Sequence, residues 1–186
     1  MATPDTSGQG SAPAYVRATL ELLGDRDPRH VLEHAPHELA KVLEGLGDAF
    51  AARPEREGGW SLLQTVRHWV DSELVWAVRL RKTIAEDRPT LQGYDQDLWV
   101  RRLRHADGNV RQALEEFLVV RAINLRFLDG RTPEELQRVA VHSERGEETV
   151  AHMIRLYAGH DLVHLRQVRR IRAAVEGAQA GAGDAG

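Results

Sequence analysis

The chain contains no cysteine, and this absence removes several classes of site at once. Without thiols there can be no disulfide bond, no thiolate metal ligand and no cysteine nucleophile. A metal ion in this protein would therefore be held by histidine, aspartate or glutamate side chains. Chemistry that uses a thiol would have to take that thiol from a bound small molecule.

The sequence also lacks an excess of positive charge and any long apolar run. The 25 Lys and Arg residues against 28 Asp and Glu residues give a net charge of −3, with a pI near 6.3. This balance offers no electrostatic basis for binding nucleic acid or an anionic membrane. No segment of about 18 apolar residues is long enough to span a bilayer, and the N-terminus does not resemble a signal peptide. We expect a cytoplasmic protein without a nucleic-acid or membrane partner.

Alternating apolar and polar residues, the pattern of a half-buried strand, are missing as well, whereas helical patterns are frequent. The sequence therefore predicts an all-α fold. Its 186 residues are enough for one domain with a sizeable core. Small, polar and glycine-rich residues fill both ends, which predicts a disordered leader over residues 1–13 and a disordered tail over residues 177–186. The folded domain would span residues 14–176.

Amphipathic periodicity predicts four long helices, over residues 36–52, 62–86, 109–128 and 149–175. Shorter helices are predicted at 15–23, at 96–104 and from Pro133 onward. Ser61 is a suitable N-cap for the second long helix, and Thr132 begins a capping-box sequence. The link over residues 89–108 is long for a compact bundle, so we expect it to cover a site. Four amphipathic helices with long connections predict a four-helix bundle.

His160 and His164 are the most informative residues of the chain. Their spacing places both rings on one face of a helix. The same face carries Met153, Leu156, Tyr157, Gln167 and Ile171, so the pair lies at the centre of a buried seam. Burying two unpartnered polar rings costs roughly 1–3 kcal/mol each, and a transition metal would satisfy both. The alternative is a pair of core histidines that other polar groups satisfy.

The third ligand is less evident from the residues. Six of the seven remaining histidines are predicted to lie at the surface, in a loop or away from the buried seam: His30, His34, His37, His105, His142 and His152. The seventh, His68, lies midway along the second long helix. The apolar arc of that helix is centred away from His68, which shares its side with Thr65 and Ser72. Periodicity by itself therefore leaves the third ligand open.

Four segments, read together, resemble a known family: residues 60–74, 91–99, 141–150 and 159–167. They are similar to the DinB-like superfamily, which includes YfiT-like bacillithiol transferases and related mycothiol-dependent enzymes. The resemblance covers most of residues 14–175. Its most specific feature is the order of one histidine on the second long helix and then an H-x-x-x-H motif on the fourth.

This resemblance implies a four-helix bundle that holds a divalent metal, often nickel or zinc, through three histidines. Transferred to this chain, the ligands are His68, His160 and His164. Arg67 and Trp69 depart from the aliphatic residues that the family often has beside the first histidine. These departures change the wall of the pocket rather than the ligand set, and they leave the substrate open.

Three neutral imidazoles would leave a divalent metal its full charge and open positions for water or substrate. Such a metal lowers the pKa of bound water towards about 7, or stabilises a thiolate. Ligating imidazoles need their other nitrogen oriented by a neighbouring group. Gln167 and Asp71 lie one helical turn beyond His164 and His68, so we expect them to supply this support. For Asp71, a solvated position on the helix surface is the alternative.

Other polar residues are candidates for contact with a substrate. Arg121 and Asn124 fall on the inner face of the third long helix, and a buried arginine requires an anion. That anion would be Glu73, in an internal salt bridge, or else a substrate carboxylate. Tyr94 and Asp95 lie in the long link, where they would cover the mouth of the metal site.

Two functional hypotheses follow. The first is a metal-dependent enzyme acting on a small molecule, either a transferase that uses an external low-molecular-weight thiol or a hydrolase. The alternative is a non-catalytic, metal-binding stress-response bundle. We also expect a homodimer, because Trp76 and Trp99 fall at outer positions that one small bundle does not need to bury.

Overall fold

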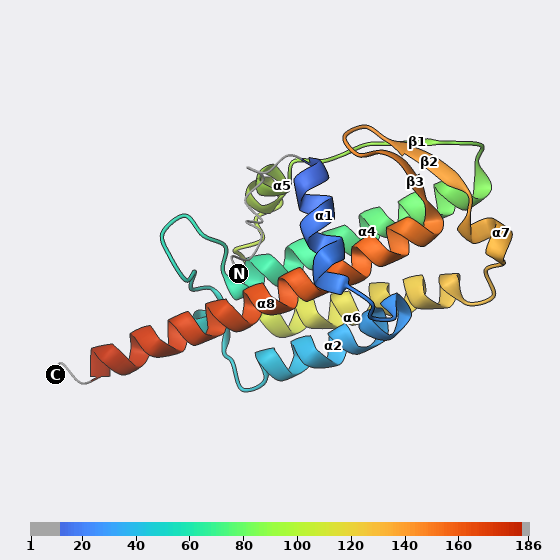
Figure 1. Ribbon diagram of the computed structural model, residues 1–186. Coiled ribbons are helices and arrows are strands. Elements are labelled where there is room, and N and C mark those ends of the chain that lie inside the picture. Colours follow the sequence, from blue (N-terminus) through green and yellow to red (C-terminus); the bar gives the residue numbers. More distant parts are fainter. Residues whose placement is uncertain (1–11, 184–186) are drawn as a thin grey trace.

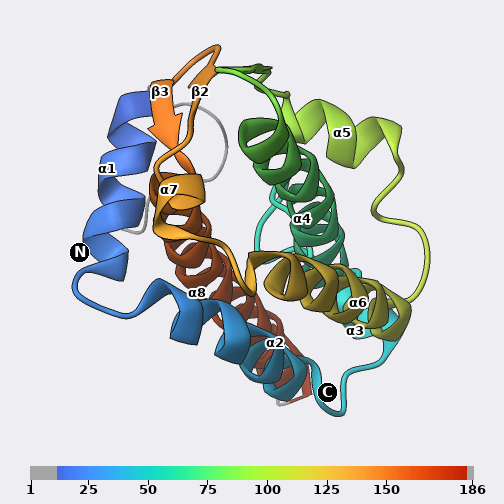
Figure 2. The same cartoon turned by 90° about the vertical axis from the view of Figure 1, so that its right-hand side faces the viewer.

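The computed structural model describes residues 12–183, with side chains as far as residue 178. Four long helices form its body: α2 (Pro28–Leu43), α4 (Leu62–Ala85), α6 (Val110–Leu128) and α8 (Val150–Gly183). Helix α2 packs against α6 and α8, and α4 packs against the same two helices from the other side (Figures 1 and 2). The predicted all-α four-helix bundle is therefore confirmed.

Four shorter helices surround this bundle: α1 (Ala12–Leu23), α3 (Asp48–Ala51), α5 (Gln96–Arg102) and α7 (Pro133–Leu136). Helix α1 lies along α8, while α5 packs against α4 (Figure 2). The short helices predicted at 15–23, at 96–104 and after Thr132 correspond to α1, α5 and α7. Within the described residues, no helix is both long enough and apolar enough to cross a membrane.

A small sheet at one end of the bundle corrects the expectation that the chain has no strands. It consists of β1 (Thr90–Leu91), β2 (Val139–His142) and β3 (Gly146–Thr149), in the order β1-β2-β3. Strand β1 pairs in parallel with β2, which forms an antiparallel hairpin with β3 (Figure 1). Runs of two to four residues are too short to show a reliable alternation. The sheet joins the segment after α4 to the segment before α8.

The helix starts follow the capping chemistry visible in the sequence. The Ser61 side chain accepts from the Gln64 backbone N–H at 3.2 Å, and the Gln64 side chain accepts from the Ser61 N–H at 2.9 Å. Thr132 and Glu135 form the same reciprocal capping box at α7. These pairs satisfy backbone donors that a helix start leaves free, so the predicted starts of α4 and α7 are confirmed.

The first long helix was predicted eight residues too late. Instead of residues 36–52 it spans Pro28–Leu43, with Asp27 as N-cap and Pro28 at the first helical position. Proline is favoured at that position because its missing N–H would be unpaired there in any case. The helix ends before Gly45, whose φ of +75° suits glycine, and the short α3 follows as a separate element.

Pro36 lies inside α2 rather than at its start. A proline in a helix interior removes the hydrogen bond to the carbonyl four residues earlier, which here belongs to Leu32. The structure supplies a replacement donor, because the Arg121 Nη1 atom on α6 lies 2.7 Å from the Leu32 carbonyl oxygen. A tertiary contact therefore permits a proline that local rules exclude.

The chain ends also differ from the expected disorder. Helix α1 begins at Ala12, so residues 12 and 13 of the expected leader are helical, and residues 1–11 lie outside the described part. Helix α8 continues to Gly183, so residues 177–183 of the expected tail are helical as well. Extending an existing helix fixes one residue for each new hydrogen bond, which is far easier than starting a helix.

Aromatic side chains mark two parts of the core. Trp69 packs against Phe117 with ring centroids 4.9 Å apart, and Trp76 stacks on Tyr157 at 4.5 Å. Trp76 is fully buried, so its assignment to an outer position was wrong. Helix α8, which carries Tyr157, covers a side of α4 that periodicity alone suggested was exposed. Trp99 is half-buried and packs against Tyr94 at 4.4 Å.

Candidate metal centre

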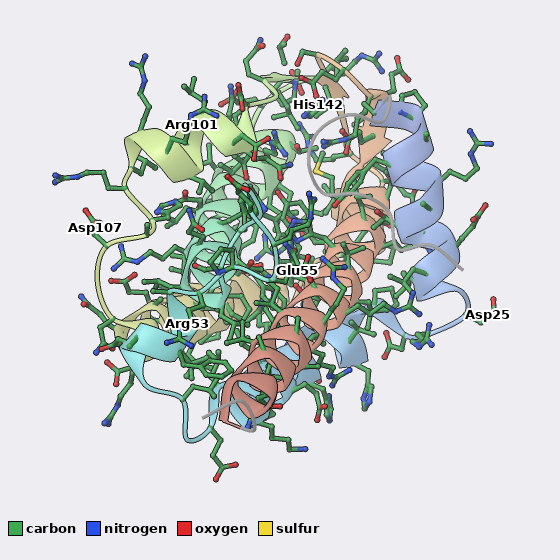
Figure 3. The ribbon with its side chains drawn as sticks, turned by 90° about the vertical axis from the view of Figure 1, so that its left-hand side faces the viewer. Asp25, Arg53, Glu55, Arg101, Asp107 and His142 are labelled. Atoms are coloured by element: carbon green, nitrogen blue, oxygen red, sulfur yellow. The ribbon has the colours of Figure 1, made fainter. Side chains whose placement is uncertain are left out.

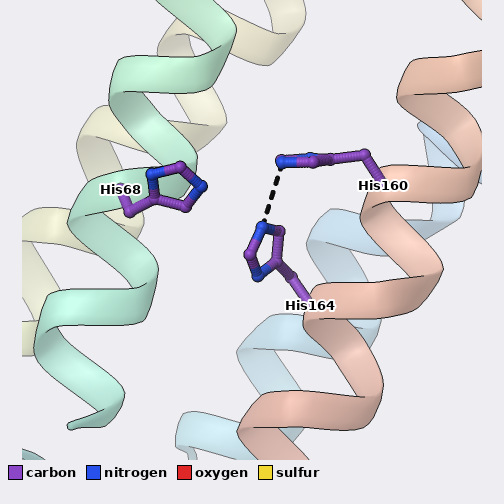
Figure 4. A group of neighbouring side chains, drawn as sticks. All are labelled: His68, His160 and His164. Carbon is purple, nitrogen blue, oxygen red and sulfur yellow. Dashed lines mark hydrogen bonds between the residues drawn. The ribbon is translucent and has the colours of Figure 1, made fainter. Parts of the chain in front are cut away.

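Three histidines from two helices converge inside the bundle. His68 projects from α4 towards His160 and His164 on α8 (Figure 4). One possible ligand atom from each side chain lies within 4.8 Å of the others. The Nε2 atoms of His160 and His164 are 3.0 Å apart, and the His68 ring centroid is 5.0 Å from that of His164. His68 and His164 are each only 1% exposed.

His68 faces inward although the apolar arc of α4 is centred elsewhere. The reason is that α4 is covered on more than one side. Helices α6 and α8 contact one part of its surface, and α5 packs on another. Trp60, which precedes the helix, lies over the His68 ring with centroids 4.9 Å apart. A helix covered in this way has no single solvated face, so periodicity does not locate its polar site residues.

Hydrogen bonds prepare the rings for a cation. The Gln167 amide oxygen lies 2.8 Å from His164 Nδ1, so Nδ1 carries the proton and the Nε2 lone pair faces His160 Nε2. Ser72 Oγ lies 3.4 Å from His68 Nε2 and 3.1 Å from the Tyr94 hydroxyl. His160 Nδ1 is buried and has no protein partner among the described residues.

Burial keeps all three imidazoles uncharged. It lowers the pKa of His164 to about 4, a shift that the Gln167 hydrogen bond only partly offsets. Burial, followed by the neighbouring imidazoles, holds the pKa values of His68 and His160 well below their ordinary range. At neutral pH the site therefore offers three neutral nitrogen ligands, a donor set that fits zinc or nickel.

These shifts predict that the metal-free protein loses stability as the pH falls from 6.5 towards 5. In that window the unfolded histidines take up protons near their ordinary pKa of 6.5, whereas the buried ones stay neutral. Each such histidine should lower the free energy of unfolding by about 1.4 kcal/mol per pH unit. Urea unfolding at several pH values in the presence of a chelator measures the slope.

Two variants test whether the buried histidines cause that slope. His164→Gln removes one titrating group and should reduce the slope by about 1.4 kcal/mol per pH unit, whereas the exposed His37→Gln should not change it. Asp161 acts in the opposite direction, because burial raises its pKa to about 6. It is one group against four histidines, since burial lowers the pKa of His142 as well. A pH-independent stability over this window would contradict the neutral, buried state of the histidines.

A buried ionic network lies beside the histidines and connects all four long helices. Arg121 on α6 forms a two-pronged contact with Asp161 on α8, at 2.7 and 2.8 Å, and bonds Glu73 on α4 at 2.8 Å. Its third contact is the Leu32 carbonyl on α2. Burial alone would lower the pKa of Arg121, but Asp161 and Glu73 raise it above its ordinary value.

This network decides the role of three candidates for substrate contact. Arg121 pairs with Glu73, which was one of the two alternatives, and Asp161 is a second partner that the sequence did not suggest. Asn124 donates to the backbone and side-chain oxygens of Glu73, at 3.0 Å each. Since Arg121, Asn124 and Glu73 are all fully buried in these contacts, they hold the bundle together and do not face a substrate.

Asp71 and Asp95 do not reach the histidine cluster. The Asp71 carboxylate lies 2.6 Å from Nε2 of His105, so it supports that ring and not His68. His105, predicted to be exposed, is 5% exposed because the loop that carries it, after α5, brings its ring against Asp71 on α4. Asp95 caps α5 by accepting from the Leu98 N–H at 2.8 Å. The expected role of Asp71 was wrong, because its partner His105 comes from a segment that local spacing does not place. Asp95 acts as a local helix cap and is not among the residues that line the cavity beside His160.

A small cavity of about 90 Å³ adjoins His160. Its walls come from α1, α4, α8, the segment after β1 and the β2–β3 hairpin. Tyr94 is among them, so this candidate from the long link does lie beside the histidines. Arg79 and His142 also line the cavity, and sequence reasoning missed both. His142 was predicted in a loop, whereas it ends β2 and is 2% exposed.

Comparison with known proteins agrees with this architecture. The sequence model of the DinB superfamily matches residues 31–168, about three quarters of the chain. The chain belongs to the DinB superfamily. The match includes the region of the three histidines, so the resemblance noted from the sequence is confirmed.

Relatives of this DinB protein have been named after metal chemistry. A Bacillus mycoides protein, 30% identical over 159 residues, covers 85% of this chain and 90% of its own length. A Bacillus cereus protein is 30% identical over 142 residues, which make up 76% of this chain and 81% of that protein. Both carry the name "putative metal-dependent hydrolase". YfiT from Bacillus subtilis, a solved structure with a four-helix bundle, matches 77% of this chain and 83% of its own with a TM-score of 0.72 and 23% identity.

Proposed function

We propose that this DinB protein is a metal-dependent enzyme that acts on a small molecule, with His68, His160 and His164 as ligands of a zinc or nickel ion. The observation that carries the proposal is a cluster of three neutral imidazoles, two of them buried and the third, His160, lining a cavity. A structural metal site has no need of a cavity, whereas a catalytic one must admit a substrate. The names of the relatives support hydrolysis, and the absence of cysteine supports the use of an external thiol.

A divalent metal bound by three imidazoles would supply Lewis acidity and an activated water or thiolate. The chain's own groups would then bind and orient the substrate. Gln167 holds the His164 ring in one tautomer. Ser72 and Tyr94 place hydroxyl groups between His68 and the cavity, where they can donate to a polar substrate atom. The two reactions differ only in the nucleophile, which is water for a hydrolase and an external thiol for a transferase.

The test is metal analysis of protein purified without an affinity metal column, followed by activity screens. One screen uses small esters and amides, and the other uses a low-molecular-weight thiol with an electrophile. We expect about one zinc or nickel ion per chain and turnover in one screen that a chelator abolishes. Stoichiometric metal without turnover in either screen would favour a non-catalytic, metal-binding stress-response bundle instead.

We also propose that the protein forms a homodimer through neighbouring faces of α4 and α6. These faces expose large apolar side chains: Leu74, Val78, Leu118, Val119 and Ile123. Leu74 from α4 and Val119 from α6 line the same surface hollow. Exposed apolar surface that two helices share is characteristic of interfaces. The buried Trp76, on which the sequence-based expectation rested, takes no part in it.

Light scattering tests this assembly. At micromolar concentrations the protein should have twice the chain mass of 20.8 kDa. Val119→Glu places a charge in the centre of the proposed interface and should shift the mass to that of one chain. The exposed Arg126→Glu, also on α6, serves as a control and should leave the dimer unchanged. A single-chain mass for the unmodified protein would contradict the proposal.

A further inference from the structure

The cavity beside His160 has an unusual distribution of charge. Arg79, which contributes to its wall from α4, is only 7% exposed. Its one hydrogen bond within the described residues runs from Nη2 to the carbonyl oxygen of Gln92, at 2.6 Å. No carboxylate among those residues forms a salt bridge with it. A buried guanidinium with only a neutral acceptor lacks the anion that normally compensates its charge.

The second arginine in the wall behaves differently. Arg145, from the β2–β3 turn, contacts the buried carboxylate of Glu148 at 2.7 to 3.1 Å. Its charge is therefore balanced inside the protein. Of the two arginines in the cavity wall, only Arg79 has no carboxylate partner among the described residues. A ligand group with a single negative charge would balance it.

His142 supplies a second donor at the same cavity. Its Nδ1 atom accepts from the backbone N–H of Glu144 at 3.2 Å, so the ring proton lies on Nε2. That nitrogen is buried and has no acceptor within residues 12–178, whose side chains the structure describes. Burial, with Arg145 and Arg79 nearby, lowers the pKa of His142 to about 3, so the ring is neutral at physiological pH. A buried N–H without an acceptor costs free energy unless a ligand or water fills the place. Figure 3 shows His142 at the end of the bundle that carries the sheet.

We propose that this cavity binds the carboxylate group of the substrate, with Arg79 and His142 as its donors. A carboxylate accepts from a guanidinium and an imidazole N–H at once, and its single charge balances Arg79. The rest of the substrate would then lie towards His160, where the proposed metal acts. This inference rests on the proposed function and narrows its substrate to a small carboxylic acid. The cavity volume of about 90 Å³ is small, which favours a short carboxylic acid.

Glu144 lies at the edge of the same cavity. It is exposed and packs over Gly93, where an added Cβ would collide with its Oε1 atom. Its carboxylate forms no salt bridge with Arg79 or Arg145 among the described contacts, so it does not provide the missing anion. Its negative charge should instead weaken the binding of another anion. Replacing Glu144 with a neutral residue should therefore strengthen that binding, which is opposite to the effect expected from replacing Arg79 or His142.

Calorimetric titration with sodium propionate tests the proposal, with propionamide as the uncharged ligand of the same shape. Metal-free protein is used first, because propionate would otherwise also bind an exposed metal. We expect propionate to bind at least about tenfold more tightly than propionamide. Equal affinities for the two ligands, or no heat from propionate, would overturn the inference.

Three variants assign the binding to the named side chains. Arg79→Gln and His142→Asn should each weaken the affinity for propionate by about tenfold or more. In His142→Asn the asparagine oxygen can still accept the hydrogen bond from the Glu144 N–H. Glu144→Gln should increase the affinity for propionate by up to about fivefold at low salt. Unchanged affinity in His142→Asn, or weaker binding in Glu144→Gln, would contradict the assignment. If Arg79→Gln does not fold, as judged by circular dichroism, the other two variants and the ligand pair decide.

Metal content measured on the same samples separates this inference from the proposed function. If the three histidines hold stoichiometric metal but propionate does not bind, only the proposed carboxylate site is contradicted. If the protein takes up no metal but binds propionate in a way that depends on Arg79, the proposed metal chemistry is contradicted and the carboxylate site is supported.

Discussion

Replacing His164 with alanine is expected to remove the bound metal and, with it, the activity. The variant leaves two imidazoles of the proposed set, His68 and His160, which cannot hold a catalytic ion as three do. Loss of a group that merely supports a metal ligand weakens metal affinity about 10- to 100-fold, so loss of the ligand should exceed this. Metal content by mass spectrometry, and turnover measured in parallel, provide the test.

Two further variants should show a smaller loss of metal affinity and no loss, respectively. Gln167→Ala keeps all three imidazoles but removes the acceptor 2.8 Å from His164 Nδ1, so metal affinity should fall by about 10- to 100-fold. His152→Ala, on the same helix but outside the cluster, should bind metal normally. If His164→Ala loses its metal and keeps full activity, the metal is not the catalyst.

Replacing Arg121 with methionine is expected to destabilise the protein by about 3–5 kcal/mol. Glu73 and Asp161 would remain buried without their counter-charge, and the Leu32 carbonyl opposite Pro36 would lose its donor. For a chain of this length the melting temperature should fall by about 6–20 °C. Thermal unfolding of the metal-free protein measures the change.

The control is to remove the buried charges together. A triple variant with Arg121→Met, Glu73→Gln and Asp161→Asn has no uncompensated ion, so it should recover much of the lost stability. Arg126→Met, at an exposed position of α6, should cost little. A single Arg121→Met variant as stable as the parent would show that the ionic network is not needed to hold the four helices together.

Local sequence signals located most helices well. The capping pair of Ser61 and Gln64 marks the start of α4, and the Thr132 pair marks α7, because these bonds form between residues three apart. The exception was α2, where Pro36 was read as a helix start. Only the distant Arg121 makes that proline acceptable within the helix, and no local rule includes such a contact.

The sequence by itself determined what depends on neighbouring residues: the helical class, most helix boundaries and the pairing of His160 with His164 on one face. It also excluded thiol ligands, since it has no cysteine. His68 entered through family resemblance, because periodicity on a helix covered from several sides does not say which residue faces a site.

Tertiary structure alone decided which polar groups meet. Arg121 finds Asp161 across 40 positions and Glu73 across 48, and Asp71 finds His105 across 34. Arg79 and His142, from different elements, line one cavity. The physical reason is that side-chain hydrogen bonds and ion pairs act over about 3 Å. Periodicity along one helix indicates which way a residue points, but only the packing of the other elements determines which group lies within that distance.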